Sequence, residues 1–172
     1  VGGMADITER KQAENEIQHL AFYDPLTQLP NRALLMDRLQ HALTTSHRNQ
    51  QHGALLFIDL DDFKTLNDTC GHNVGDQFLK MIAGRLRDSV RESDTVARLG
   101  GDEFVVLLEN LSYQAEEAAA QTELVGEKIL ALFQEPFLHS NHEYHGQASI
   151  GATLFYHDEY GTDELLKQAD IA

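Results

Sequence analysis

Two glycines followed by two acidic residues stand between two strand-like segments, and this arrangement constrains the fold more than any other part of the chain. Residues 98–104 read Arg-Leu-Gly-Gly-Asp-Glu-Phe. The segments 95–99 and 104–108 are rich in valine and leucine, which favours β-strands. Glycine turns tightly without steric cost, so the pattern predicts a β-hairpin with Asp102 and Glu103 at its tip. Gly-Gly-Asp is also ordinary turn chemistry, so the hairpin alone leaves open whether its acids have a function.

A second acidic cluster follows a long apolar run. Residues 53–60 are almost entirely apolar, which is typical of a central strand buried on both faces. Asp59, Asp61 and Asp62 stand at the end of this run. A carboxylate at a buried strand end is costly unless it is paired or bound to a cation, and Mg²⁺ prefers carboxylate, water and phosphate oxygens. The two clusters together point to a site for Mg²⁺ and a nucleotide; the alternative is a solvated acidic loop that closes the strand.

Further motifs occur in a definite order along the chain. They are Asp-Pro-Leu-Thr-Gln-Leu-Pro-Asn-Arg at 24–32, Phe-Lys-Thr-Leu-Asn-Asp at 63–68, Gly-His-Asn-Val-Gly-Asp at 71–76, Ser-Ile-Gly at 149–151 and Ala-Asp-Ile-Ala at 169–172. Together with the hairpin they resemble the motifs of the GGDEF domain, the diguanylate cyclase family. The resemblance begins at Asp24 and continues to the end of the chain. It divides the chain into an N-terminal linker or signalling helix at 1–23 and a GGDEF domain at 24–172.

The composition fits one compact domain. The 172 residues carry a formal net charge of −15 at pH 7, which argues against binding of nucleic acid or anionic membranes through bulk electrostatics. The one cysteine, Cys70, excludes an internal disulfide and suits a reducing compartment. No stretch of the sequence is long and apolar enough to span a membrane. We therefore expect a cytoplasmic domain with no nucleic-acid partner and no membrane contact by this segment, although its parent protein could be attached to a membrane through other sequence.

The first residues predict a charged helix. It begins near Asp6, with Asp6 or Thr8 as its N-cap, and it carries a narrow apolar stripe at helical spacing. The stripe consists of Ala13, Ile17, Leu20 and Ala21. Such a stripe suits pairing with another helix; the alternative is a solvated helix that folds back on its own domain. Residues 6–11 resemble the exit from a PAS sensor domain into a signalling helix. Residues 1–5 would then be the remnant of such a sensor, and the chain a fragment of a longer signalling protein.

The rest of the chain alternates between helical and strand-like patterns. We expect helices at 31–47, from 73, at 112–133 and, capped by Thr162, at the end, with strands at 53–60, 137–144 and 147–156 and the hairpin at 95–108. An antiparallel hairpin among helices and strands indicates the α+β class, with a central, mainly antiparallel sheet flanked by helices. The resemblance implies the palm-like, ferredoxin-related arrangement of nucleotide cyclases and polymerases.

The resemblance also implies an activity. Diguanylate cyclases condense two GTP molecules into cyclic di-GMP and release two pyrophosphates, and each step is attack of a ribose 3′-hydroxyl on the α-phosphorus of the other GTP. Two protomers of a homodimer each present one GTP, with Mg²⁺ (or Mn²⁺) as cofactor. The implied metal ligands are Asp59, the backbone carbonyl of Leu60, Asp102 and Glu103. Asp102 would also accept the proton of the hydroxyl, and Glu103 would support the metal, so these two are the implied catalytic residues.

The remaining site residues would bind the nucleotide. They are Phe63, Lys64, Asn67, His72, Asp76, Gly100 and Gly101. The glycines would let phosphates approach the hairpin backbone, and Lys64 would contact the terminal phosphates. Asn67 and Asp76 would meet the edge of guanine, to which an amide and a carboxylate are complementary. From the residues alone, His72 could instead cap a helix, and Asp76 could be a first-turn carboxylate that favours the helix dipole.

Two further features concern regulation and completeness. Arg-Glu-Ser-Asp at 91–94 matches the family's R-x-x-D site for inhibitory product, with Arg91 suited to phosphate or guanine and Asp94 to a guanine edge. From these residues alone, the segment could instead be the charged end of a helix. The chain stops at Ala172, before the family's usual C-terminal end and the basic residues that help to hold the triphosphate. Two functions therefore stay open: an active, product-inhibited diguanylate cyclase, or a non-catalytic GTP- or cyclic di-GMP-binding module of a composite sensor and phosphodiesterase protein.

Overall fold

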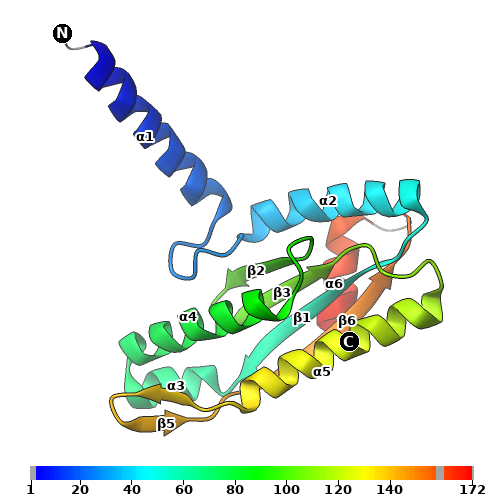
Figure 1. Cartoon of the computed structure of the whole chain (residues 1–172). Coiled ribbons are helices and arrows are strands. Elements are labelled where there is room, and N and C mark those ends of the chain that lie inside the picture. Colours follow the sequence, from blue (N-terminus) through cyan, green and yellow to red (C-terminus); the bar gives the residue numbers. More distant parts are fainter. Residues whose placement is uncertain (1–2, 158–160, 172) are drawn as a thin grey trace.

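The computed structural model describes residues 3–157 and 161–171, which form a layered domain with one helix projecting from it (Figure 1). In chain order the elements are α1 (Gly3–Phe22), α2 (Arg32–Asn49), β1 (Gly53–Asp61), α3 (Phe63–Cys70), α4 (His72–Ser89), β2 (Thr95–Gly100), β3 (Glu103–Leu108), α5 (Ala115–Gln134), β4 (Phe137–His139), β5 (His142–Tyr144), β6 (Gln147–Phe155) and α6 (Thr162–Ile171).

A four-stranded sheet forms the centre of the domain. Its strand order is β2-β3-β1-β6, and each neighbouring pair is antiparallel. The central strand β1 lies between β3 and β6, and its residues 53–58 are all buried, as the apolar run predicts. The expected α+β class, with an antiparallel sheet flanked by helices, is therefore confirmed.

Alternate residues of β1 supply two separate cores, one on each face of the sheet. Ala54, Leu56 and Ile58 belong to the core that includes buried side chains of α4 and α5. Leu55 and Phe57 belong to the other core, together with α2 and α6. Burial of a leucine, isoleucine or phenylalanine side chain contributes about 1.5–3 kcal/mol. The sheet is thus held between two layers of helices, which gives its strand ends fixed positions.

The segment after α5 differs from the prediction. A single strand at 137–144 is wrong, because β4 and β5 pair only with each other as a separate hairpin. Ser140 and Asn141 between them have φ values of 50° and 67°, the left-handed pair that a tight two-residue hairpin turn requires. The predicted elements also lack α3. This helix has only eight residues, too few for a helical period to stand out in the sequence.

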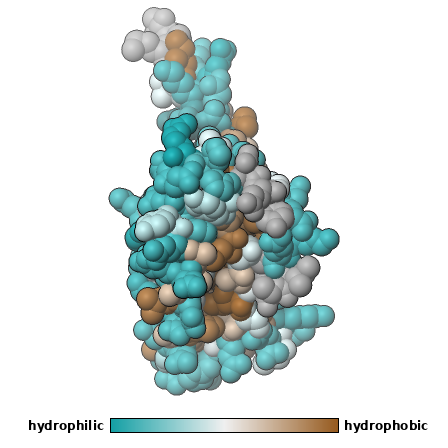
Figure 2. All heavy atoms as spheres, turned by 90° about the vertical axis from the view of Figure 1, so that its right-hand side faces the viewer, coloured by the Kyte–Doolittle hydropathy of each residue, from teal (hydrophilic) through white to brown (hydrophobic). Residues whose placement is uncertain are grey.

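The helix α1 stands away from the rest of the domain. It begins at Gly3, so the expected N-cap at Asp6 or Thr8 is wrong, and Asp6 lies instead in the first turn, where its charge favours the helix dipole. Ile17 and Leu20 are 66% and 63% exposed. Figure 2 shows the projecting helix above the body of the domain, with hydrophobic side chains among the hydrophilic ones. The alternative of a helix that folds back on its own domain is therefore not what the structure has.

Parts of two expectations lie outside the described residues. These are residues 1–2 of the expected sensor remnant and Ala172 of the last motif. Within the part of the chain that the structure describes, no helix has the length and apolar character needed to cross a membrane.

Candidate functional site

The end of β1 and the tip of the β2–β3 hairpin lie side by side. Asp59 is the sheet partner of Glu103. The backbone N–H of Leu60 donates to the carbonyl oxygen of Asp102 at 3.2 Å, which ties the tip to the strand end. The structure therefore brings together the two acidic clusters that are far apart in the sequence.

Negative charge accumulates where these segments meet. Burial raises the pKa of Asp59, and the nearby carboxylates of Asp102, Glu103 and Asp61 raise it further. Asp59 and Glu103 are nevertheless exposed, and Asp102 is half-buried, so the cluster opens to solvent. A cation bound here would relieve the repulsion among these groups and would lower the pKa of Asp59 again.

The donor set fits a metal ion that is bound together with a substrate. Among the residues described, no three His, Cys, Asp or Glu side chains form a group that could hold a metal ion. Mg²⁺ does not need such a group, because it usually keeps several waters and takes one or two protein carboxylates plus substrate phosphates. Asp59 and Asp102 can supply these carboxylates, and the backbone carbonyl of Leu60 can supply a further oxygen.

The hairpin tip leaves room for a ligand. Gly101 has a φ of +46°, in the left-handed region that favours glycine. A side-chain carbon built on Gly100 or Gly101 would meet no atom within 4 Å. The need for glycine at 101 thus comes from the backbone conformation, and the open space above the tip allows a phosphate chain to approach.

An ion pair that the sequence analysis missed holds the tip in place. Arg98 Nη1 donates to the two carboxylate oxygens of Asp24 at 3.0 and 3.1 Å, while Nε and Nη2 donate to the carbonyl of Gly101 at 3.1 and 2.9 Å. The Arg98 and Asp24 side chains are only 12% and 15% exposed. Burial alone would raise the pKa of Asp24, but hydrogen bonds from Thr27 and Arg98 outweigh it and lower the pKa. Both residues stand in motifs, yet no pattern in the sequence pairs them.

The N-terminus of α3 lies directly after the acidic strand end. Lys64 is exposed in its first turn. The first N–H groups of a helix have no partner within the helix, and Asp62 makes no side-chain hydrogen bond to cap them. This turn can therefore receive an anionic group. The ring of Phe63 is buried and stacks on Phe78 with centroids 6.3 Å apart, so only the backbone of Phe63 is available to a substrate.

Helices α3 and α4 approach each other closely around Asn67. A side-chain carbon on Gly75 would lie 1.7 Å from Oδ1 of Asn67, so only glycine allows this approach. Within the described residues, Oδ1 of Asn67 is buried and has no hydrogen-bond partner. A buried polar atom without a partner costs about 1–3 kcal/mol. Because this atom is buried against Gly75, the Asn67 side chain must turn outward before Oδ1 can accept a hydrogen bond from a ligand.

The other two predicted base contacts lie on α4. His72 is exposed at the first position of the helix, and the N-cap is Gly71, so the alternative of His72 as a cap is wrong. Asp76 is half-buried and follows Gly75. It lies beyond the first turn, which contains no acidic residue, so the alternative of a first-turn carboxylate is also wrong. With both structural alternatives removed, these side chains remain available for a ligand.

The R-x-x-D segment lies at the opposite end of β2 from the hairpin tip. It forms a turn in which the N–H of Asp94 donates to the carbonyl of Arg91 at 2.9 Å. The Asp94 carboxylate accepts from the N–H of Arg91 at 3.1 Å and from that of Glu109 at 3.2 Å. The six residues of β2 separate this turn from the tip by about 20 Å. The structure thus joins Arg91 and Asp94 but keeps them away from the acidic cluster.

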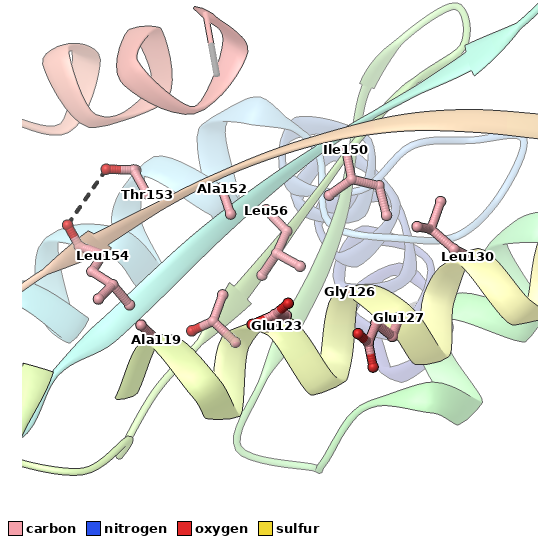
Figure 3. A pocket seen from close by; sticks show the side chains of 11 residues that line it. Leu56, Ala119, Glu123, Gly126, Glu127, Leu130, Ile150, Ala152, Thr153 and Leu154 are labelled. Carbon is pink, nitrogen blue, oxygen red and sulfur yellow. Dashed lines mark hydrogen bonds between the residues drawn. The ribbon is translucent and has the colours of Figure 1, made fainter. Parts of the chain in front are cut away.

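A separate cavity of about 460 Å³ lies between α5 and β6 (Figure 3). Its wall is mostly apolar, with Leu56, Ile150 and Leu154 on the sheet, while Glu123 and Glu127 project from α5. None of the predicted site residues lines it. It does not belong to the site built by the strand ends and the hairpin.

The sequence and the fold are both similar to those of known proteins. Residues 21–172 match the family model described as "Diguanylate cyclase, GGDEF domain". The chain is 44% identical, over 96% of its length, to the bifunctional diguanylate cyclase/cyclic di-GMP phosphodiesterase MucR of Pseudomonas aeruginosa. It is 35% identical, over 97% of its length, to the cyclic di-GMP phosphodiesterase PdeR of Escherichia coli. It spans only 23% of MucR and 24% of PdeR.

Two solved structures have a closely similar fold. The GGDEF domain of TpbB from Pseudomonas aeruginosa gives a TM-score of 0.78 at 41% identity, covering 87% of this chain and 84% of that one. The GGDEF domain of DgcB from Caulobacter crescentus, solved in complex with c-di-GMP, gives a TM-score of 0.78 at 28% identity, covering 88% of this chain and 87% of that one.

Proposed function

The chain belongs to the GGDEF family of diguanylate cyclase domains, and on that premise we propose that it condenses two GTP molecules into cyclic di-GMP. Two pyrophosphates leave, one for each attack of a 3′-hydroxyl on an α-phosphorus. The observation that carries the proposal is the meeting of Asp59 with Asp102 and Glu103, where burial and these neighbouring carboxylates raise the pKa of Asp59. Such a cluster is suited to a divalent cation and to proton transfer.

The acidic residues take distinct roles in this proposal. Asp59, Asp102 and the carbonyl of Leu60 would hold Mg²⁺ or Mn²⁺, with Glu103 in support. When bound, the metal supplies positive charge against the negative charge that develops on the phosphate oxygens. Asp102 accepts the proton of the attacking hydroxyl. The hydrogen bond from the N–H of Leu60 to the carbonyl oxygen of Asp102 keeps Asp102 at the end of β1 during this step.

The nucleotide is held by the neighbouring elements. Lys64 and the first N–H groups of α3 bind the terminal phosphates, and Gly100 and Gly101 let the phosphate chain lie against the hairpin. Oδ1 of Asn67, which has no partner among the described residues, accepts a hydrogen bond from the guanine edge. Asp76 accepts from guanine N1–H and the amino group. Adenine lacks this donor pattern, so the site rejects ATP.

Catalysis in this proposal requires a homodimer, because each domain holds one GTP. The projecting helix α1 supports this part of the proposal, since it exposes Ile17 and Leu20 one turn apart. Pairing of two such stripes buries them and brings two domains together. We further propose that α1 is a PAS-type signalling helix and that the domain works in the cytoplasm, where GTP is available.

Product inhibition completes the proposal. Arg91 and Asp94 form one turn at the far end of β2. The Arg91 guanidinium contacts Asp94 and the carbonyl of Glu109, but its side chain is 59% exposed, so a phosphate can still reach it. The DgcB domain, at 28% identity, was solved with c-di-GMP, which supports cyclic di-GMP as a ligand of this chain too.

A second candidate function is a non-catalytic regulatory module that binds GTP or cyclic di-GMP. The observation that favours it is the 35% identity to PdeR, whose name states phosphodiesterase activity alone. In such a protein the GGDEF domain would report nucleotide levels to a neighbouring domain rather than synthesise the product.

Product analysis after incubation with Mg-GTP separates the two functions. We expect the wild-type protein to form cyclic di-GMP and pyrophosphate. The Asp102→Ala variant should form them more slowly by a factor of about 10³ or more. Asp37→Ala, which removes an exposed carboxylate on α2, is the matched control and keeps full activity. Equal product from the wild-type protein and Asp102→Ala contradicts the catalytic proposal. Binding of GTP without any product supports the regulatory module.

A further inference from the structure

The C-terminal end of α2 meets the segment that follows β6, and each brings one histidine to the contact (Figure 1). Nδ1 of His47 lies 2.9 Å from Nδ1 of His157, and the two rings meet edge to face with their centroids 5.0 Å apart. Two neutral imidazoles can share a proton in this arrangement, with one Nδ1 as donor and the other as acceptor. The same two nitrogens can instead bind one cation, because Nδ1 has a free lone pair in the tautomer that carries its proton on Nε2.

Neighbouring residues hold the second histidine in position. The backbone N–H of His157 donates to the hydroxyl oxygen of Ser46 at 3.3 Å, and Ser46 is buried on α2 next to His47 in the sequence. The ring of Tyr156 packs against the ring of His157 with centroids 3.8 Å apart. The hydroxyl of Tyr156 in turn donates to Oε1 of Gln50 at 2.6 Å. These contacts arrange the two imidazoles independently of the bond between them, as a binding site requires.

The distance between the two nitrogens suits a transition metal. An imidazole nitrogen lies about 2.0–2.1 Å from a metal that it binds. Two such nitrogens at adjacent corners of a square-planar or octahedral centre are then about 2.9 Å apart, against about 3.4 Å at a tetrahedral centre. The 2.9 Å between the Nδ1 atoms of His47 and His157 matches the first of these values. Cu²⁺ and Ni²⁺ adopt square-planar or tetragonal geometries with nitrogen ligands, whereas Mg²⁺ prefers oxygen.

The surroundings of the histidine pair favour positive charge. His47 lies in the last turn of α2, where the final C=O groups of a helix have no partner within the helix and carry partial negative charge. His47 is exposed and His157 is half-buried, so water can fill the remaining positions around a metal. Among the described residues, no third His, Cys, Asp or Glu completes the group. The arrangement therefore fits an open site, with two protein nitrogens and water as ligands.

The histidine pair lies away from the acidic cluster. Phe155, the last residue of β6, is the sheet partner of Gly53 at the start of β1, whereas Asp59 stands near the opposite end of β1. The strand spans about 20 Å from Gly53 to Asp59. The two sets of donors also differ in kind, since carboxylates suit Mg²⁺ and imidazoles suit Cu²⁺, Ni²⁺ and Zn²⁺. A metal at the histidine pair therefore leaves the proposed catalytic site free.

We propose that His47 and His157 bind a divalent transition metal, Cu²⁺ or Ni²⁺, through their Nδ1 atoms, and that the metal joins the end of α2 to the segment after β6. The metal takes the place of the shared proton. The imidazole that donated from Nδ1 carries its proton on Nε2 instead, so the neutral pair releases no net proton. The two residues are 110 positions apart in the sequence, so they bind one metal together only in the folded protein. The metal therefore stabilises the folded domain by mass action.

Calorimetric titration of Ni²⁺ into the 172-residue chain, together with thermal unfolding, tests the proposal. We expect Ni²⁺ to bind the wild-type protein and to raise its melting temperature. His47→Ala and His157→Asn should each weaken binding by about tenfold or more, because loss of a ligand costs no less than loss of a residue that only orients one. Both variants should fold, since alanine favours a helix and asparagine tolerates the φ of 66° at position 157. His145→Ala, which removes an exposed histidine outside the pair, is the matched control and should bind as the wild-type protein does.

The electron paramagnetic resonance spectrum of bound Cu²⁺ identifies the ligands. We expect coupling to two imidazoles in the wild-type protein and to one fewer in His47→Ala and in His157→Asn. Absence of Ni²⁺ binding by the wild-type protein overturns the proposal. Undiminished binding by either variant also overturns it, because the metal would then lie elsewhere. Each outcome leaves the proposed synthesis of cyclic di-GMP untouched, because the acidic cluster is unchanged in all of these variants.

Discussion

The two ends of β2 have opposite electrostatic designs. At its C-terminal end lies the hairpin tip, where several carboxylates meet. Burial raises the pKa of Asp59 there, and repulsion from the neighbouring carboxylates raises it further. At its N-terminal end, the Arg91–Asp94 turn joins opposite charges, and Arg38 and Arg87 stand nearby. The proposed catalytic end therefore needs a cation to offset its like charges, whereas the other end pairs opposite charges within the protein.

The largest expected effect comes from the ion pair that fixes the tip. Arg98→Ala should destabilise the protein by about 3 kcal/mol, because it leaves the buried carboxylate of Asp24 without its partner. Arg91→Ala should cost less than about 1 kcal/mol, because the Arg91 side chain is mostly exposed. Urea unfolding of both variants measures the difference. Equal losses of stability in the two variants would contradict a tighter ion pair at the hairpin tip than at the Arg91–Asp94 turn.

The pH dependence of stability should have opposite signs at the two ends. The pKa of Asp24 is lowered in the folded state, so its stabilisation is present above its unfolded pKa and is lost as the pH falls through the lower, folded value. Burial and Asp94 raise the pKa of Glu109, so its contribution is fully present below its unfolded pKa and is lost as the pH rises through the higher, folded value.

Two amide variants measure these contributions. Asp24→Asn should cost about 2 kcal/mol at pH 7, and this cost should disappear in strong acid. Glu109→Gln should instead raise stability at pH 7 slightly, by about 0.5 kcal/mol. Thermal unfolding of the two variants from pH 7 down into strong acid follows both effects. A cost of Asp24→Asn that does not vary with pH would contradict the ion-pair account of the tip.

The smallest effect concerns the acidic cluster without metal. Asp59→Asn should raise the unfolding free energy by up to about 0.5 kcal/mol in a chelator, because it removes repulsion in a cluster that solvent screens. Addition of Mg²⁺ with a GTP analogue should stabilise the wild-type protein and not the variant. If Asp59→Asn instead had a lower unfolding free energy than the wild-type protein in a chelator, the Asp59 carboxylate would have a stabilising partner within the protein.

Local patterns predicted most of the fold. The apolar run of β1 gave a strand buried on both faces, and the two glycines gave the hairpin. The helix at 112–133 and the strand at 147–156 fall close to α5 and β6. These predictions hold because burial and turn conformation act on neighbouring residues.

Features that depend on distant residues could not be predicted. The pairing of Asp24 with Arg98 arises only when the first turn of the domain packs beside the hairpin. The close approach at Gly75, which leaves Asn67 without a partner in the described structure, depends on the packing of α4 against α3. The β4–β5 hairpin depends on left-handed conformations at Ser140 and Asn141, neither of which is glycine. Sequence motifs thus indicated the residues of the proposed cation site, but not the ion pair and the helix packing that hold the site in position.

Binding of Mn²⁺ in the presence of a non-hydrolysable GTP analogue shows whether β1 and the hairpin tip form a cation site, and the electron paramagnetic resonance signal of the free ion measures it. We predict that the wild-type protein binds Mn²⁺ together with the nucleotide, and that Asp59→Asn and Asp102→Asn each weaken this binding by at least about tenfold. Asp37→Asn on α2 should bind as the wild-type protein does. If Asp59→Asn and Asp102→Asn both bound Mn²⁺ as tightly as the wild-type protein, this result would contradict a cation site where β1 meets the hairpin tip.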